Sequence, residues 1–97
     1  MLPPELPIEK EIRREKARTL GRAGERLEAA CAAAWTLHDA RLRGELVGPV
    51  EYGAARARAV DLRHLLLIQR EALGLRSQAD VDRCYPLPPE DLDSPAP

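Results

Sequence analysis

Four side chains in the sequence could bind a soft metal ion or form a thiol–imidazole pair: Cys31, His38, His64 and Cys84. On a helix, Cys31 and His38 would lie about 10.5 Å apart, which is too far for both to bind one zinc ion. A thiol nucleophile would also need a group that orients the histidine, and an open site. We therefore expect Cys31 to be a small buried residue, and we predict no catalytic residue, no metal and no cofactor.

Arginines recur at every fourth position near the N-terminus, the spacing of one helix face. They are Arg14, Arg18, Arg22 and Arg26. This ridge could contact nucleic-acid phosphates, but glutamates interleave with it and no aromatic residue lies nearby to stack on bases. A solvated, ion-paired face is the usual meaning of such a run. A small nucleic-acid-associated regulator is therefore kept as the alternative function, with salt-dependent duplex binding as its signature.

The elements that position these side chains are helices, because the apolar residues follow helical spacing over long stretches without proline. Prolines at positions 7 and 49 suit first helical residues, and Gly44 and Gly74 suit residues that follow a helix end. We predict helices over about 8–43, 50–73 and 78–84, with Ser77 as the cap of the third. The predicted class is all-α: an antiparallel two-helix hairpin with a short third helix.

The connection near residue 46 sets a register in which paired residue numbers sum to about 93. Leu27 then faces Leu66, and Glu28 faces Arg63. Apolar residues meet apolar ones and charges meet opposite charges, which supports the hairpin. Gly21 and Gly24 in the first helix could permit close packing or a kink. We favour packing.

The second helix carries more apolar surface than one partner helix can cover. Its first stripe, which includes Leu62 and Leu66, faces the first helix, and a second stripe lies roughly 100° away. The second stripe consists of Val50, Ala54, Leu65, Ile68 and Ala72. The third helix offers only Val81 and Tyr85 to cover it. We therefore predict that two hairpins form a homodimeric, coiled-coil-like helical bundle through this stripe.

Trp35 lies at the edge of the apolar face of the first helix. Tryptophan is enriched in binding hot spots, so Trp35 could contact a partner, which could be another protein. It could equally pack against the connection of the hairpin. The sequence leaves both interpretations open.

The C-terminal residues are rich in proline and acidic side chains. We predict a helical hairpin domain over 1–86 and an extended acidic tail over 87–97 that has little apolar surface to bury. The run Pro86–Leu87–Pro88–Pro89 loosely resembles a polyproline II ligand. Removal of residues 88–97 is therefore expected to change stability little.

The composition fits one small domain, and its charge balance does not indicate binding to a membrane or to nucleic acid. The 97 residues carry a net charge of -1, which favours neither an anionic membrane nor nucleic acid. No apolar run approaches the roughly 18 residues that a membrane span requires. Two cysteines suggest a reducing compartment, and we expect the cytoplasm.

The runs EKARTLGRAG at 15–24 and QREALGLR at 69–76 resemble short bacterial helical proteins of a domain-of-unknown-function family. The resemblance covers about residues 8–90 and implies no activity. It implies a stand-alone bacterial protein. The expected function is that of a small non-catalytic helical interaction or adaptor protein that acts as a homo-oligomer.

Overall fold

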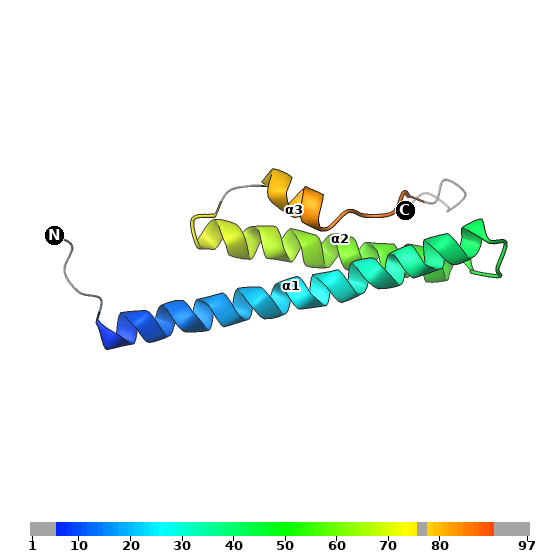
Figure 1. The fold of residues 1–97 in the computed structure, drawn as a ribbon. Helices are drawn as coiled ribbons and strands as arrows, with labels where there is room; N and C mark the ends of the chain where they lie inside the picture. The colour runs from blue at the N-terminus through cyan, green and yellow to red at the C-terminus, as the bar shows by residue number, and fades with distance from the viewer. Residues whose placement is uncertain (1–5, 76–77, 91–97) are drawn as a thin grey trace.

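The computed structural model describes residues 6–75 and 78–90, and all regular structure in them is helical (Figure 1). Helix α1 spans Pro7–Leu42, α2 spans Pro49–Ala72 and α3 spans Gln78–Cys84. The first two form an antiparallel hairpin, and α3 runs along α2 (Figure 1). The predicted class and its three helices are confirmed, with bounds that differ by one residue at most.

The helix ends form where the local sequence predicts them. Prolines are the first residues of both long helices. Gly44 and Gly74 each have φ of +80°, a left-handed conformation that glycine adopts without strain. After Gly74, the N–H of Leu75 donates a 2.9 Å hydrogen bond to the carbonyl of Arg70. An equivalent bond follows Gly44, so both helices end in a Schellman motif that satisfies their last carbonyls.

The core lies between α1 and α2 and extends beneath α3. Leu27 and Leu66, predicted to face each other, are 0% and 4% exposed and belong to one cluster, so the register is confirmed there. Val81 of α3 joins the same cluster. Because this contact holds α3 against the hairpin, the third helix is part of the core rather than an appendage.

The predicted pairing of Glu28 with Arg63 is not what the structure shows. The Arg63 guanidinium lies 3.5 Å from the Asp82 carboxylate, which α3 brings to the same side of α2. A register argument based on the two long helices alone cannot include Asp82, because Asp82 lies on α3. The docking of the third helix therefore changes the charge pairing without changing the apolar register.

Helix α1 continues through both of its interior glycines. A Cβ atom on Gly24 would lie 3.0 Å from the Tyr85 hydroxyl, whereas one on Gly21 would meet nothing within 4 Å. The packing interpretation is confirmed for Gly24, because a side chain there would press on Tyr85. It is wrong for Gly21.

The first residues of the predicted tail lie against the hairpin. Pro88 is almost fully buried, and the carbonyls of Pro88 and Pro89 accept hydrogen bonds from α2. The prediction of little buried surface therefore fails at Pro88, whose apolar ring is buried, whereas Pro89 is exposed and contributes only its carbonyl. Residues 91–97 of the predicted tail, like the predicted cap Ser77, lie outside the described residues.

Candidate interaction surfaces

The hairpin has two sides, which differ in what covers them. We call the side covered by residues 78–90 the closed face; it includes Arg56 and Arg63 of α2. The opposite side, which includes Leu65 and Ala72, is the open face, and both of these side chains are exposed. Because Arg63 and Leu65 are two residues apart, they lie on nearly opposite sides of α2.

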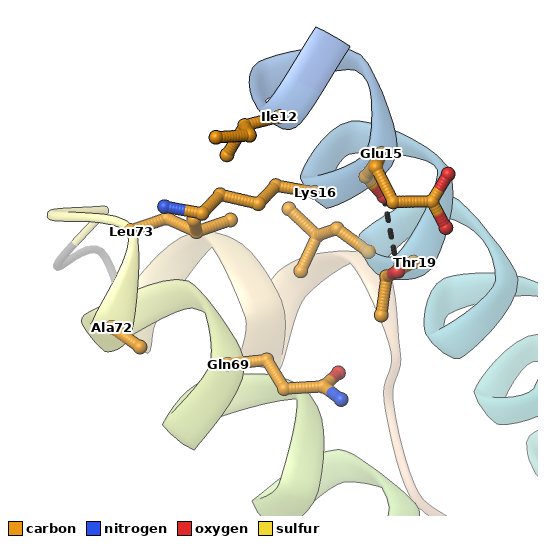
Figure 2. Close-up of a pocket in the computed structure, with 8 residues that line it drawn as sticks. Ile12, Glu15, Lys16, Thr19, Gln69, Ala72 and Leu73 are labelled. Carbon is orange, nitrogen blue, oxygen red and sulfur yellow. Dashed lines mark hydrogen bonds between the residues drawn. The ribbon is translucent and has the colours of Figure 1, made fainter. Parts of the chain in front are cut away.

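An apolar groove of about 330 Å³ lies on the open face between the N-terminal part of α1 and the end of α2 (Figure 2). Its lining residues are Ile12, Glu15, Lys16, Thr19 and Leu20 of α1, and Gln69, Ala72 and Leu73 of α2. In Figure 2 the aliphatic stem of Lys16 extends from α1 toward Leu73, so its methylene groups add apolar surface. A second hollow of about 210 Å³ shares Thr19 and Gln69 and also contacts Leu65. The two hollows therefore form one continuous surface.

The five predicted interface residues are all exposed. Leu65 and Ile68 are 45% and 50% exposed, although both are large and apolar. Helix α3 does not cover them, because Val81 packs into the core with Leu66 instead. Leu65 and Ala72 line the two hollows, whereas Val50 belongs to the first turn of α2 at the other end of the helix.

Sequence reasoning placed the predicted interface on α2 alone, whereas the groove is lined by α1 as well. Ile12 and Leu20 line the same groove, and Ile12 is 50% exposed. The available signal was the length of the first predicted helix, which exceeds that of the second. With 36 residues against 24, α1 is about 18 Å longer than α2, so its first turns have no α2 beside them (Figure 1).

One polar atom stands out in the groove. The side-chain Oε1 of Gln69 is buried but has no hydrogen-bond partner in the described chain. The neighbouring Thr19 hydroxyl donates a 3.0 Å bond to the Glu15 carbonyl in its own helix, drawn as a dashed line in Figure 2. A buried acceptor without a donor costs about 1–3 kcal/mol. The groove thus contains an acceptor that a docked group could satisfy.

The closed face contains an aromatic cluster near the hairpin connection. The rings of Trp35 and His38 meet edge to face at 5.4 Å, and His38 lies 6.1 Å from the ring of Tyr52. The Arg41 guanidinium lies 5.3 Å from the centre of the Tyr52 ring, a cation–π distance. Tyr52 is 2% exposed and Trp35 is half-buried, so the cluster is packed within the chain.

Three donors of the closed face hold the backbone of the C-terminal segment. Trp35 Nε1 donates a 2.8 Å bond to the Pro86 carbonyl. Arg56 Nε donates a 2.9 Å bond to the Pro88 carbonyl, and the Tyr52 hydroxyl donates to that of Pro89. Of the two interpretations of Trp35, the contact shown is intramolecular, but with residue 86 rather than with the connection.

Sequence reasoning assigned neither Tyr52 nor Arg56 to a site. The signal that could have found them is their four-residue spacing on one helix face, which presents an aromatic hydroxyl and a guanidinium together. A Pro-Leu-Pro-Pro run in the same chain supplies the matching carbonyls.

The arginine ridge is exposed along its whole length. The Glu15 carboxylate lies 3.5 Å from Arg18 and 3.6 Å from Arg22, so part of the ridge is ion-paired within its own helix. Exposed pairs of this kind contribute little to stability. Nucleic-acid binding stays a prediction, and these contacts do not favour it.

The cysteines differ in environment. Cys31 is buried and Cys84 is exposed, and both are free thiols. Burial raises the pKa of the Cys31 thiol, and the nearby Arg63 charge lowers it by a smaller amount. A protonated thiol is a poor nucleophile, so the environment of Cys31 suits a core residue. Within residues 6–75 and 78–90, no three His, Cys, Asp or Glu side chains gather as a metal site.

Comparisons with protein-family models, curated proteins and solved structures found no match. The resemblance to short bacterial helical proteins therefore stays a prediction. Across the described segments, none of the helices combines the length and apolar character that crossing a bilayer demands.

Proposed function

We propose that the protein is a small non-catalytic interaction protein that acts as a homodimer through its open face. The observation that carries the proposal is the apolar groove between α1 and α2, which no described segment covers. Large apolar side chains around it remain about half exposed, among them Ile12 and Ile68. Because about half of each side chain is already buried, each of these forgoes about 0.8–1.5 kcal/mol of burial while it stays in water.

A second copy is the occupant that fits, because the same surface contains both a groove and a helix that lacks a partner. The first turns of α1 extend beyond α2, and Ile8 there is 64% exposed (Figure 1). A two-fold axis across the open face would pack this face of each chain against the same face of the other. Such an interface is isologous, the commonest arrangement in soluble dimers.

The dimensions of the open face suit a dimer. A strip along α2 would be about 36 Å long and, across two packed helices, about 20 Å wide. That area, about 700 Å², approaches the roughly 800 Å² per partner of a standard interface before the α1 overhang is added. The unsatisfied Gln69 oxygen could also accept a hydrogen bond from a donor of the second copy.

Light scattering at tens of micromolar protein tests the proposal directly. We expect about twice the chain mass of 10.8 kDa. Ile68→Glu should yield monomers, because it places a charge in the interface. Leu46→Glu is the matched control, since Leu46 is fully exposed in the hairpin connection and its replacement should leave a dimer. A wild-type monomer, or an Ile68→Glu variant that remains a folded dimer, would refute the open face as the interface.

We also infer a cytoplasmic location in a bacterial cell. The two free thiols support a reducing compartment, although they do not identify one. An adaptor of this kind would bring no chemistry of its own and would act by holding two copies, or a copy and another protein, together.

A further inference from the structure

The closed face binds an extended segment in a way that differs from helix packing. Residues 86–90 follow the end of α3 and form no regular structure. Their backbone is held by side-chain donors of two helices: Trp35 of α1, and Tyr52 and Arg56 of α2. The acceptors are the carbonyls of Pro86, Pro88 and Pro89.

This arrangement has the features of polyproline recognition. A polyproline II segment has no internal hydrogen bonds, so its carbonyls are free to accept bonds from a binding groove. Grooves that bind such segments are lined by aromatic side chains. Here the aromatic cluster contains Trp35, His38 and Tyr52, and the Pro88 side chain is almost fully buried.

The segment is extended because of its covalent structure. Each proline fixes its own φ near −65°, and a residue that precedes proline is pushed out of the helical region. Pro86, Pro88 and Pro89 therefore restrict the run from Tyr85 to Pro89 before it contacts the hairpin. A preformed segment loses little entropy on binding, which is the advantage of proline-rich ligands.

Anchoring of α3 and binding of the proline segment involve different contacts. Val81 packs in the core and Asp82 pairs with Arg63, so α3 has contacts of its own, although Leu87 of the segment packs against the same core cluster. Another segment could therefore replace residues 86–90 while the Val81 and Asp82 contacts remain. Departure of residues 86–90 would remove the acceptors of Trp35, Tyr52 and Arg56 together, which favours replacement by another carbonyl-rich segment.

We propose that the cleft formed by Trp35, Tyr52 and Arg56 is a binding site for proline-rich segments, and that residues 86–89 are its resident occupant. The ligand class is a Pro-x-Pro-Pro segment of a partner protein, which competes with the resident one. The donors recognise carbonyls, Pro88 is the one fully buried side chain of residues 86–90, and Leu87 is half-buried against the core, so the proline spacing sets most of the specificity. This site is on the closed face and does not depend on dimerisation through the open face.

The test measures peptide binding to the full chain and to its Pro88→Asp variant. The probe is a fluorescent peptide of the sequence Tyr-Pro-Leu-Pro-Pro-Glu, read by anisotropy. In the wild type the tethered segment competes at a high effective concentration. Pro88→Asp places a charge at a buried position and removes this competitor, so we expect the Kd of the variant to be at least about tenfold lower. Pro89→Asp, one residue on at an exposed ring, is the matched control and should change the Kd less.

Two further peptides establish the ligand class. Ala-Pro-Ala-Pro-Pro-Ala retains the proline spacing and should bind the variant, whereas a peptide with all three prolines replaced by alanine should not. Adding Tyr52→Phe to the variant should weaken binding about two- to tenfold, because one donor is lost. Trp35 is the single tryptophan, so its emission reports the same event independently.

Circular dichroism first establishes that Pro88→Asp is folded. If it is not, the milder double variant Pro86→Ala/Pro89→Ala replaces it, with a smaller gain in the same direction. Failure of both proline peptides to bind a folded variant would overturn the proposal. Binding of the native sequence alone, without the proline-spaced peptide, would also overturn it and show that the segment is only an element of the fold.

Discussion

The two faces of the hairpin are built from the same two helices but are covered differently. On the closed face, residues 78–90 bring an apolar anchor, Val81, and carbonyls that match three donors. On the open face, Leu65 and Ile68 remain about half exposed beside a groove. Packing two helices together leaves two opposite faces of the hairpin exposed. The described residues cover one of these faces, the closed face.

The two faces also differ in the chemical groups that they present. The closed face is rich in donors, such as Trp35 and Arg56, because its occupant is an irregular segment with many carbonyls. The groove on the open face is mostly apolar, which suits the proposed second copy, because a helix satisfies its own backbone groups and offers side chains alone. The polarity of the two grooves is thus consistent with coil on the closed face and, under the proposed dimer, with helix on the open face.

The strongest test of this comparison removes the closed-face cover. Deletion of residues 88–97 should lower the free energy of unfolding by about 2–4 kcal/mol, the sum of two net hydrogen bonds and one buried ring. The melting temperature should fall by about 10 °C or more in a chain of this size. Thermal denaturation followed by circular dichroism measures it. This expected loss of stability replaces the prediction, made from the composition of the tail, that removal of residues 88–97 changes stability little.

The matched control ends the chain after Glu90 and retains every described contact of the closed face. It should melt close to the full chain. Equal melting temperatures for all three proteins would show that the segment contributes nothing to stability, and the comparison between the faces would fail.

Most of the fold could be predicted because its signals are local. Pro49 and Gly74 mark helix ends through their own backbone preferences. The pairing of Leu27 with Leu66 follows from a short connection and a helical period, so the apolar register needed no further information. The unpartnered stripe of α2 could be found in the same way, since α3 proved too short to cover it.

What could not be predicted depends on contacts between distant segments. The bond from Trp35 to the Pro86 carbonyl spans 51 residues, and its acceptor is a backbone atom that every residue type has. Side-chain patterns can therefore indicate possible donors, but they do not identify which backbone carbonyl accepts the bond. Arg63 pairs with Asp82 rather than Glu28 for a related reason, because the position of α3 depends on the whole core.

A second, smaller test compares the two cysteines. Cys31→Ser should destabilise the protein by about 1–3 kcal/mol, because it buries a hydroxyl in the core of the closed face. Cys84→Ser is the matched control; its side chain is exposed, so the change should stay within about 0.5 kcal/mol. Urea denaturation of both variants measures the difference. Similar losses for both would contradict the burial of Cys31.

Cys31 also makes stability depend on alkaline pH. Burial raises the pKa of its thiol above the ordinary value of 9.0, so the folded state holds the proton more tightly than the unfolded state. The resulting stabilisation is complete below pH 9.0 and is lost as the pH rises through the folded-state pKa. We expect Cys31→Ala to remove this part of the alkaline loss, which denaturation at pH 8 and pH 10.5 would detect.

The smallest expected effect comes from two glycines of α1, and it tests how closely the closed face is packed. Alanine is favoured over glycine in a helix by about 1 kcal/mol. Gly21→Ala should gain much of this, because a Cβ atom there meets nothing within 4 Å. Gly24→Ala should gain less or lose stability, because its Cβ would lie 3.0 Å from the Tyr85 hydroxyl.

The comparison of the two variants isolates the contact, since both changes carry the same gain in helix propensity. The difference between their unfolding free energies then measures the cost of moving Tyr85 away from α1. Adding Tyr85→Phe sharpens it: without the hydroxyl, Gly24→Ala should recover most of the gain seen at Gly21. If Gly24→Ala stabilises as much as Gly21→Ala while Tyr85 is intact, the residues after α3 do not press on α1. The residues that cover the closed face would then be packed less closely against α1 than these contacts indicate.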